Sequence, residues 1–188
     1  CQGMSTANYK KADNEQIRNS LVVQAIKLIS QIQPKMFIFE NVRAFMKTIC
    51  TDTDGNDMPI SESIYSNLAD RYNIFHRVIN FKDYGVPSSR PRTIVIGTSK
   101  EFLNLSPLSL FPSRHKEIKL REAIGDLAPL DYGQRDKEDI LHFARQFPIE
   151  QLEWIKNTKE GQSSFDQPLE FQPGHYDKYG NKVVNKGA

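Results

Sequence analysis

A short apolar run that stops abruptly at polar residues is the feature that most restricts the fold of this chain. Met36-Phe37-Ile38-Phe39 follows Pro34 closely and gives way at once to Glu40 and Asn41. Four consecutive apolar residues are typical of a strand buried on both faces rather than of a surface helix. Open α/β sheets bind their ligands at the carboxyl ends of such strands. The position of Glu40 therefore indicates a functional edge of a sheet.

Amphipathic segments lie on both sides of this strand. Between residues 14 and 33, apolar residues recur at three- and four-residue spacing, which predicts a helix that ends at Pro34. Residues 60–71 show a similar pattern after a polar loop at 52–57. The expected inner face of this second helix comprises Ile64, Tyr65 and Leu68.

Two further strands are expected at 72–81 and 93–97, joined by a segment in which Gly85 and Pro87 mark a turn. So short a connection permits antiparallel pairing, because parallel strands need a long crossover. The order of helix, strand, helix, strand, strand predicts the second half of an α/β sheet that ends in an antiparallel hairpin.

The pattern weakens after about residue 130. Residues 138–156 could hold helical pieces, and residues 157–188 are rich in Gly, Pro, Gln, Lys and Asn without a sustained period. The expected helical pieces centre on Ile140, Phe143, Leu152 and Ile155.

Composition narrows the function classes. The 188 residues include 25 Lys+Arg and 23 Asp+Glu, a formal charge of +2, which excludes a histone-like polycation but permits a local basic groove. Two cysteines cannot form a disulfide framework, and no apolar run suits a membrane span or a signal peptide, so we expect a cytoplasmic protein. The chain begins at Cys1 rather than Met, which indicates a processed product or an internal segment.

Four polar residues stand where structure alone would not place them: Cys1, Glu40, Arg90 and Arg92. Taken singly, each has a simpler interpretation. A lone cysteine is usually a small buried residue, a Glu after a strand can cap the next helix, and arginines at a hairpin are usually solvated. Residues two apart in a strand project to the same side, which would bring Arg90 and Arg92 together.

Taken together, these residues belong to a series of ordered motifs. In chain order the motifs are Cys1-Gln2-Gly3-x-Ser5, Arg18-Asn19-x-Leu21, Pro34-Lys35-x-Phe37-x-x-Glu40-Asn41-Val42, Tyr84-Gly85-Val86-Pro87-x-x-Arg90-x-Arg92-x-x-x-Ile96-Gly97 and Leu120-Arg121-Glu122-Ala123-Ile124-Gly125-Asp126-Leu127. Their order and spacing resemble the DNA (cytosine-5)-methyltransferases of bacteria and phages. The resemblance covers nearly the whole chain.

The resemblance implies the fold and the partners. We expect an α/β chain, the second half of a class I S-adenosylmethionine-dependent methyltransferase (Rossmann-like) sheet, followed by part of a small target-recognition domain. Residues 1–128 would be catalytic and residues 129–188 would begin the recognition region. The implied partners are S-adenosylmethionine, whose binding motifs would lie upstream of residue 1, and double-stranded DNA, with a cognate restriction endonuclease possible. No metal and no membrane are implied.

The resemblance also implies residue roles. Cys1 would be the nucleophile that adds to C6 of cytosine, Glu40 would relieve charge at N3, Arg92 would bind O2, and Arg90 would order the site. The target base must leave the helix stack for these groups to reach it. The expected DNA contacts are Gln2, Ser5, Arg18 and Asn41.

The sequence departs from the family pattern at some positions, and other functions remain to be considered. Ser88 stands where the family usually has Gln ahead of its two arginines. A related tRNA cytosine methyltransferase would share the chemistry of Cys1 and Glu40, but residues 42–60 have no Cys-Phe-Thr tripeptide, which that group usually shows. A non-catalytic DNA-binding remnant is another alternative. Five ordered matches argue against a soluble α/β domain with chance motifs.

Overall fold

The first part of the chain is built on a three-stranded sheet. The computed structural model describes residue 4 and residues 19–184. The strands are β1 (Met36–Val42), β4 (Tyr72–Asn80) and β5 (Pro91–Ser99), and β5 lies between the other two, antiparallel to both. The antiparallel hairpin of the last two strands is therefore confirmed. As a result β1 and β4 run in the same direction, with a helix in the connection between them.

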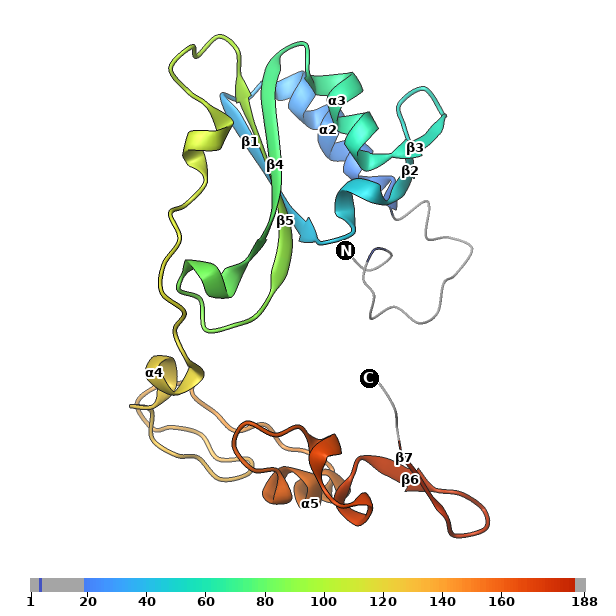
Figure 1. Ribbon diagram of the computed structural model, residues 1–188, viewed down its shortest axis with the longest axis vertical. Helices are drawn as coiled ribbons and strands as arrows, with labels where there is room; N and C mark the ends of the chain where they lie inside the picture. The colour runs from blue at the N-terminus through green and yellow to red at the C-terminus, as the bar shows by residue number, and fades with distance from the viewer. Residues whose placement is uncertain (1–3, 5–18, 185–188) are drawn as a thin grey trace. The chain divides into compact units, whose positions relative to one another are not determined.

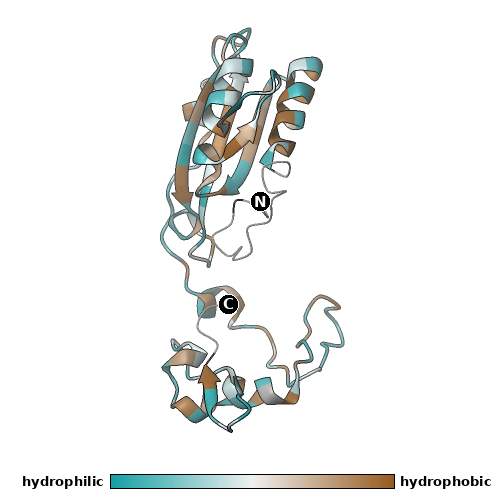
Figure 2. Ribbon diagram, turned by 90° about the vertical axis from the view of Figure 1, so that its right-hand side faces the viewer, coloured by the Kyte–Doolittle hydropathy of each residue, from teal (hydrophilic) through white to brown (hydrophobic). Residues whose placement is uncertain are grey.

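Two helices, α2 (Leu21–Ile32) and α3 (Ile60–Leu68), cover one face of this sheet (Figure 1). The hydrophobic residues of the strands and helices are seen along both layers in Figure 2. Val23 and Ile26 of α2 and Ile64 of α3 pack with Phe37 and Val95 of the strands in one buried cluster. The first helix ends as predicted: Gln33 adopts a left-handed conformation and Pro34 follows.

The predicted burial of β1 on both faces is wrong. Its side chains alternate, so that Phe37 and Phe39 contact the core while Ile38 is 56% exposed. Within the described residues, the helices lie on only one side of this strand. A continuous apolar run was therefore a poor guide to burial, because in a strand alternate residues face opposite sides.

The second helix also differs in detail from the prediction. It ends at Leu68 rather than at residue 71, and Tyr65 lies at its exposed edge, where the hydroxyl donates to the Ile74 carbonyl at 3.5 Å. Ile64 and Leu68 are buried as expected. Tyr65 therefore marks the boundary of the helix's inner face rather than its centre.

The predicted polar loop is the turn of a small hairpin, β2 (Ile49–Thr51) with β3 (Asp57–Pro59). The buried Asp52 accepts hydrogen bonds from Ser63 Oγ at 2.6 Å and from Asn67 Nδ2 at 3.0 Å, which fasten the hairpin to α3. Cys50 is fully buried beside them, and burial raises the pKa of its thiol. Its side chain belongs to the buried core cluster.

The chain divides into two compact units, Cys1–Gly125 and Asp126–Ala188. The remaining elements of the first unit are η1 (Phe45–Lys47), η2 (Phe81–Tyr84), η3 (Pro107–Leu110) and α4 (Leu120–Ile124). The second unit contains α5 (Ile149–Asn157), η4 (Ser164–Asp166), η5 (Leu169–Phe171), β6 (Gly174–Tyr176) and β7 (Lys182–Val184). Whether these units correspond to catalytic and recognition regions stays a prediction.

Short side-chain hydrogen bonds shape the second unit. Asp177 Oδ1 accepts from the backbone N–H groups of Tyr179 and Asn181 at 2.8 and 2.9 Å and holds the turn between β6 and β7. These hydrogen bonds, of which the one from the Asn181 backbone has the largest effect, keep the pKa of Asp177 below its ordinary value. Helical pieces around Leu152 and Ile155 are confirmed in α5.

Helical pieces around Ile140 and Phe143 are not found. Ile140 lies in a turn, and Phe143 forms an isolated bridge with Arg135. Among the residues described, no helix has the length and apolar character that a membrane crossing would require.

Candidate functional site

The pairing of β1 with β5 brings Glu40 and Arg92 to one face of the sheet. Glu40 lies opposite Ile94, and Val42 lies opposite Arg92. Residues paired across antiparallel strands share a face, and their diagonal neighbours are within reach of long side chains. The carboxyl end of β1 therefore meets the amino end of β5 with an acid and an arginine side by side.

The two side chains form an ion pair, with Arg92 Nε 3.0 Å from Glu40 Oε1. Arg92 is largely buried, its side chain 15% exposed, and its Nη1 also donates to the Pro91 carbonyl at 2.8 Å. The Glu40 side chain is 47% exposed. Among the described residues, Arg92 is the one ion-pair partner of the Glu40 carboxylate.

Arg90 lies in a different position from Arg92. It precedes β5, is exposed, and its backbone is bound at both ends: the N–H donates to Asn80 Oδ1 at 2.9 Å, and the carbonyl accepts from Phe81 N at 3.2 Å. The two arginines therefore do not share one strand face. An ordering role for Arg90 stays a prediction.

Asn80 is a residue that sequence reasoning missed. It is the last residue of β4, and its side chain contacts both ends of the segment Phe81–Arg90, here called the active-site loop. Besides the bond from Arg90, Oδ1 accepts from Lys82 N at 3.4 Å, and Nδ2 donates to Ser89 Oγ at 3.1 Å. An Asn directly before a turn was an available signal, since its side chain can bond nearby backbone groups.

The Asn41 side chain, next to Glu40 in the sequence, binds the backbone of its own strand. Its Oδ1 accepts from Val42 N at 2.9 Å. Across the pair, Thr93 is buried and its Oγ1 donates to the Arg43 carbonyl at 3.2 Å, which fixes the end of β1 against the start of β5. The predicted contact of Asn41 with DNA stays a prediction.

The remaining predicted site residues, Cys1, Gln2, Ser5 and Arg18, lie outside the described residues. Met4 is described, and it packs against the core cluster. Ser88, which stands where Gln was expected, is exposed in the active-site loop, and its N–H donates to the Val86 carbonyl at 2.7 Å.

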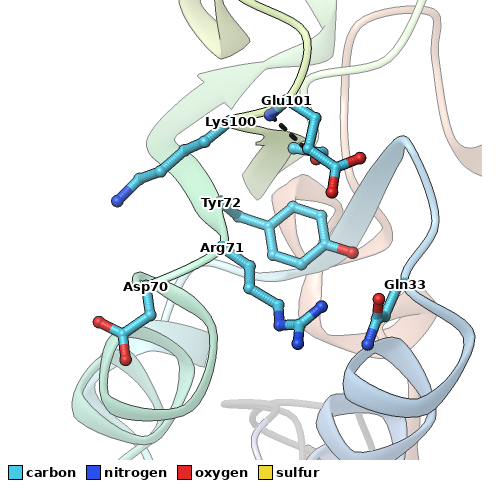
Figure 3. A pocket seen from close by; sticks show the side chains of 7 residues that line it. Gln33, Asp70, Arg71, Tyr72, Lys100 and Glu101 are labelled. Carbon is cyan, nitrogen blue, oxygen red and sulfur yellow. Dashed lines mark hydrogen bonds between the residues drawn. The ribbon is translucent and has the colours of Figure 1, made fainter.

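A cavity of about 470 Å³ lies at the end of the sheet away from Glu40, where β1 and β4 begin and β5 ends (Figure 3). Its lining mixes both charges, with Arg71 and Lys100 beside Asp70 and Glu101. It offers no apolar slot for a nucleoside, so we assign no cofactor-holding residue from it. The described residues contain no cluster of ligands that could hold a metal ion.

Comparisons with known proteins give the site its context. A family model described as C-5 cytosine-specific DNA methylase matches residues 1–186. The type II methyltransferase M1.HgaI of Avibacterium volantium is 27% identical over 190 residues, covering 100% of this chain and 50% of that protein. M.BspRI of Lysinibacillus sphaericus, also a type II methyltransferase, is 33% identical over 138 residues, covering 71% of this chain and 30% of that protein.

A solved structure resembles the chain as well. It is an E. coli DNA modification methyltransferase encoded within a prophage, and it aligns with a TM-score of 0.51 at 22% identity over 65% of this chain and 34% of that one. This likeness supports a mixed α/β fold with antiparallel strands. The chain spans half or less of the length of these proteins. Since the family model matches nearly every residue, the chain belongs to the C-5 cytosine-specific DNA methylases.

Proposed function

We propose that the complete protein transfers a methyl group from S-adenosylmethionine to C5 of a cytosine flipped out of duplex DNA. The observation that carries the proposal is the Glu40–Arg92 ion pair at the end of β1, in a chain that the methylase family model matches over residues 1–186. The names of the relatives favour a role in restriction-modification in the cytoplasm of a bacterial or phage-infected cell. A cognate restriction endonuclease is part of this proposal.

The pair matches the edge of cytosine. Along that edge O2 and N3 accept hydrogen bonds and the N4 amine donates one. A guanidinium such as Arg92 can donate to O2, while a protonated Glu40 carboxyl can donate to N3 with one oxygen and accept from N4 with the other. Thymine reverses the last two groups, so the same pair would leave polar atoms without partners. Such mismatches are a strong basis for rejecting the wrong base.

The proposed reaction begins at Cys1. Its thiolate forms a bond to C6, and the ring's electrons are relieved as the Glu40 proton passes to N3, which leaves C5 as the nucleophilic carbon of an enamine. C5 then takes the methyl group as the S–CH3 bond of the sulfonium donor breaks, and the donor leaves as a neutral thioether. In the final step the C5 proton passes to solvent, the C5–C6 double bond returns, the C6–S bond breaks to release the thiolate, and the N3 proton returns to Glu40.

The methyl donor supplies the electrophilic sulfonium methyl group. The described residues do not present a site for it, so we assign its binding to no residue. In this proposal the first unit is part of a Rossmann-like methyltransferase sheet, with residues 1–128 catalytic, and residues 129–188 begin the target-recognition region.

The experiment is mass spectrometry of the complete gene product mixed with S-adenosylmethionine and duplexes that contain 5-fluorocytosine. In 5-fluorocytosine the C5 hydrogen is replaced by fluorine, so the final step has no proton to remove. The covalent intermediate should therefore persist as a protein-DNA adduct mapped to Cys1. The matched control is Cys1→Ser, which should bind DNA but form no adduct. An adduct at another residue, or cytosine methylation by the Cys1→Ser variant, would contradict the covalent role.

A further inference from the structure

A basic segment without regular secondary structure lies against the active-site loop. Residues Pro112–Lys119, here called the basic strap, follow η3, and Figure 1 shows them passing beside the connection between β4 and β5. The His115 N–H donates to the Asp83 carbonyl at 2.9 Å, and Lys82 Nζ lies 3.3 Å from Glu117 Oε2. The strap and the loop are thus joined by a backbone bond and an ion pair.

Gly85 lies where the active-site loop faces the strap. This residue has φ +79 and closes η2 in the left-handed conformation that favours glycine. A side chain here would meet His115 Cβ at 3.6 Å and Ile118 Cδ1 at 3.8 Å. The turn of the loop therefore has a defined packing partner in the strap.

The two segments concentrate positive charge. Residues 112–119 contain three cations and one carboxylate, and the active-site loop, residues 81–90, contains two cations and one carboxylate. Together they have a net charge of +3, whereas the whole chain has +2. The carboxylate of the strap, Glu117, is already paired with Lys82. Net positive charge therefore gathers on this one surface of a nearly neutral chain.

The strap cations are available to a partner. Arg114, Lys116 and Lys119 are exposed, and none of them forms an ion pair with another residue of the described chain. The active-site loop that the strap contacts leads directly into Arg92, so these cations lie on the same loop assembly as the Glu40–Arg92 pair. A polyanion held there would have its backbone next to the candidate base-binding site.

We propose that the basic strap and the active-site loop form one phosphate-binding surface, which holds the DNA backbone flanking the target cytosine through Arg114, Lys116 and Lys119. This inference rests on the proposed function, which supplies DNA as the partner. Exposed lysine and arginine side chains that neutralise phosphates position a duplex without reading its sequence. The surface therefore contributes to affinity for any duplex and not to the choice of target.

The test compares two triple variants of the complete protein. R114Q/K116Q/K119Q removes the strap charges, and K27Q/R71Q/K100Q removes three exposed charges from α2 and from the opposite end of the sheet. Duplex binding is measured by fluorescence anisotropy over a range of salt concentrations, with target and non-target DNA. Removing one cation that neutralises a phosphate reduces the slope of log K against log salt by about 0.9.

The strap variant should lower that slope by about 2 to 3 for both duplexes, while the control variant retains the wild-type slope. Equal slopes in the two variants, with wild-type protein still forming the 5-fluorocytosine adduct, would overturn the strap proposal alone. A lower slope of log K against log salt for target DNA alone would also overturn the strap proposal, because phosphate contacts carry no sequence information. If wild-type protein neither forms the adduct nor binds duplexes in a salt-dependent way, both proposals are wrong.

Discussion

The two faces of the β1–β5 pair differ in what they do, although their residues alternate along the same strands. Phe37, Val95 and Gly97 face α2 and α3 and belong to the packed layer, whereas Glu40 and Arg92 lie on the other face, where Ile38 is exposed. One face is covered by the two helices, and the other carries the candidate site together with the buried Ile79 and Ile96. Because neighbouring residues point to opposite faces, the two roles are separable by single substitutions.

The largest expected effect is on the helix-covered face. Phe37 packs edge-on against Tyr72, with ring centroids 5.1 Å apart, and against Phe39 at 5.4 Å. Phe37→Ala should lower the free energy of unfolding by about 3–5 kcal/mol, because it removes a buried ring and leaves a cavity. Urea unfolding followed by circular dichroism measures the change. Ile38→Ala is the matched control, and a loss as large as that of Phe37→Ala would contradict the difference between the faces.

The pattern of apolar residues, Pro and Gly along the sequence was sufficient to predict much of the sheet and the helices that cover it. The apolar run of β1, the end of α2 at Pro34 and the β4–β5 hairpin depend on residues close in sequence, and all three are confirmed. The β2–β3 hairpin was missed because its three-residue strands are fixed by Asp52 contacts to α3, which no local pattern reveals. The exposure of Ile38 likewise depends on which face the helices cover.

The candidate site was predictable to a similar degree. Glu40 and Arg92 were identified from motif spacing, but their contact requires the strand register. The position of Asn80 before a turn was a signal for a local backbone bond, but its bonds to Ser89 and Arg90 at the far end of the active-site loop depend on the strand pairing.

A second prediction applies to the open face. Glu40→Gln retains the shape of the side chain but cannot donate a proton to N3, so methyl transfer in a single turnover should slow by about 10²-fold or more. The free energy of unfolding should change by less than about 1 kcal/mol, because the Glu40 side chain is half-exposed and the Gln amide oxygen can still accept from the largely buried Arg92. Rapid-quench methylation assays measure the rate. An unchanged rate would exclude an acid role for Glu40, and a large loss of stability would show that the open face also supports the fold.

A third prediction tests how tightly the covered face is packed. A Cβ added at Gly97 would lie 2.1 Å from Phe37 Cε1, so the ring must move. Gly97→Ala should lower the free energy of unfolding by about 1–3 kcal/mol through overpacking. In a Phe37→Ala background the same change should cost much less, because the ring that blocks it is gone. A double-mutant cycle measures this coupling, and strictly additive effects would contradict the assigned contact.

The smallest expected effect concerns Asn80, the last residue of β4. Asn80→Ala removes the acceptor for the backbone N–H groups of Lys82 and Arg90 and should lower stability by about 1 kcal/mol, as loss of a comparable capping side chain does. Asn80→Asp keeps that acceptor, and Ser89 Oγ can donate to the second carboxylate oxygen where it accepted from Nδ2, so this variant should restore most of the loss. Since the loop leads into Arg92, turnover at saturating DNA should follow the same order, with Ala slower than Asp. Equal turnover in both variants, despite the stability difference, would show that the loop's anchor serves the fold alone and that Arg92 is positioned entirely by its strand and by Glu40.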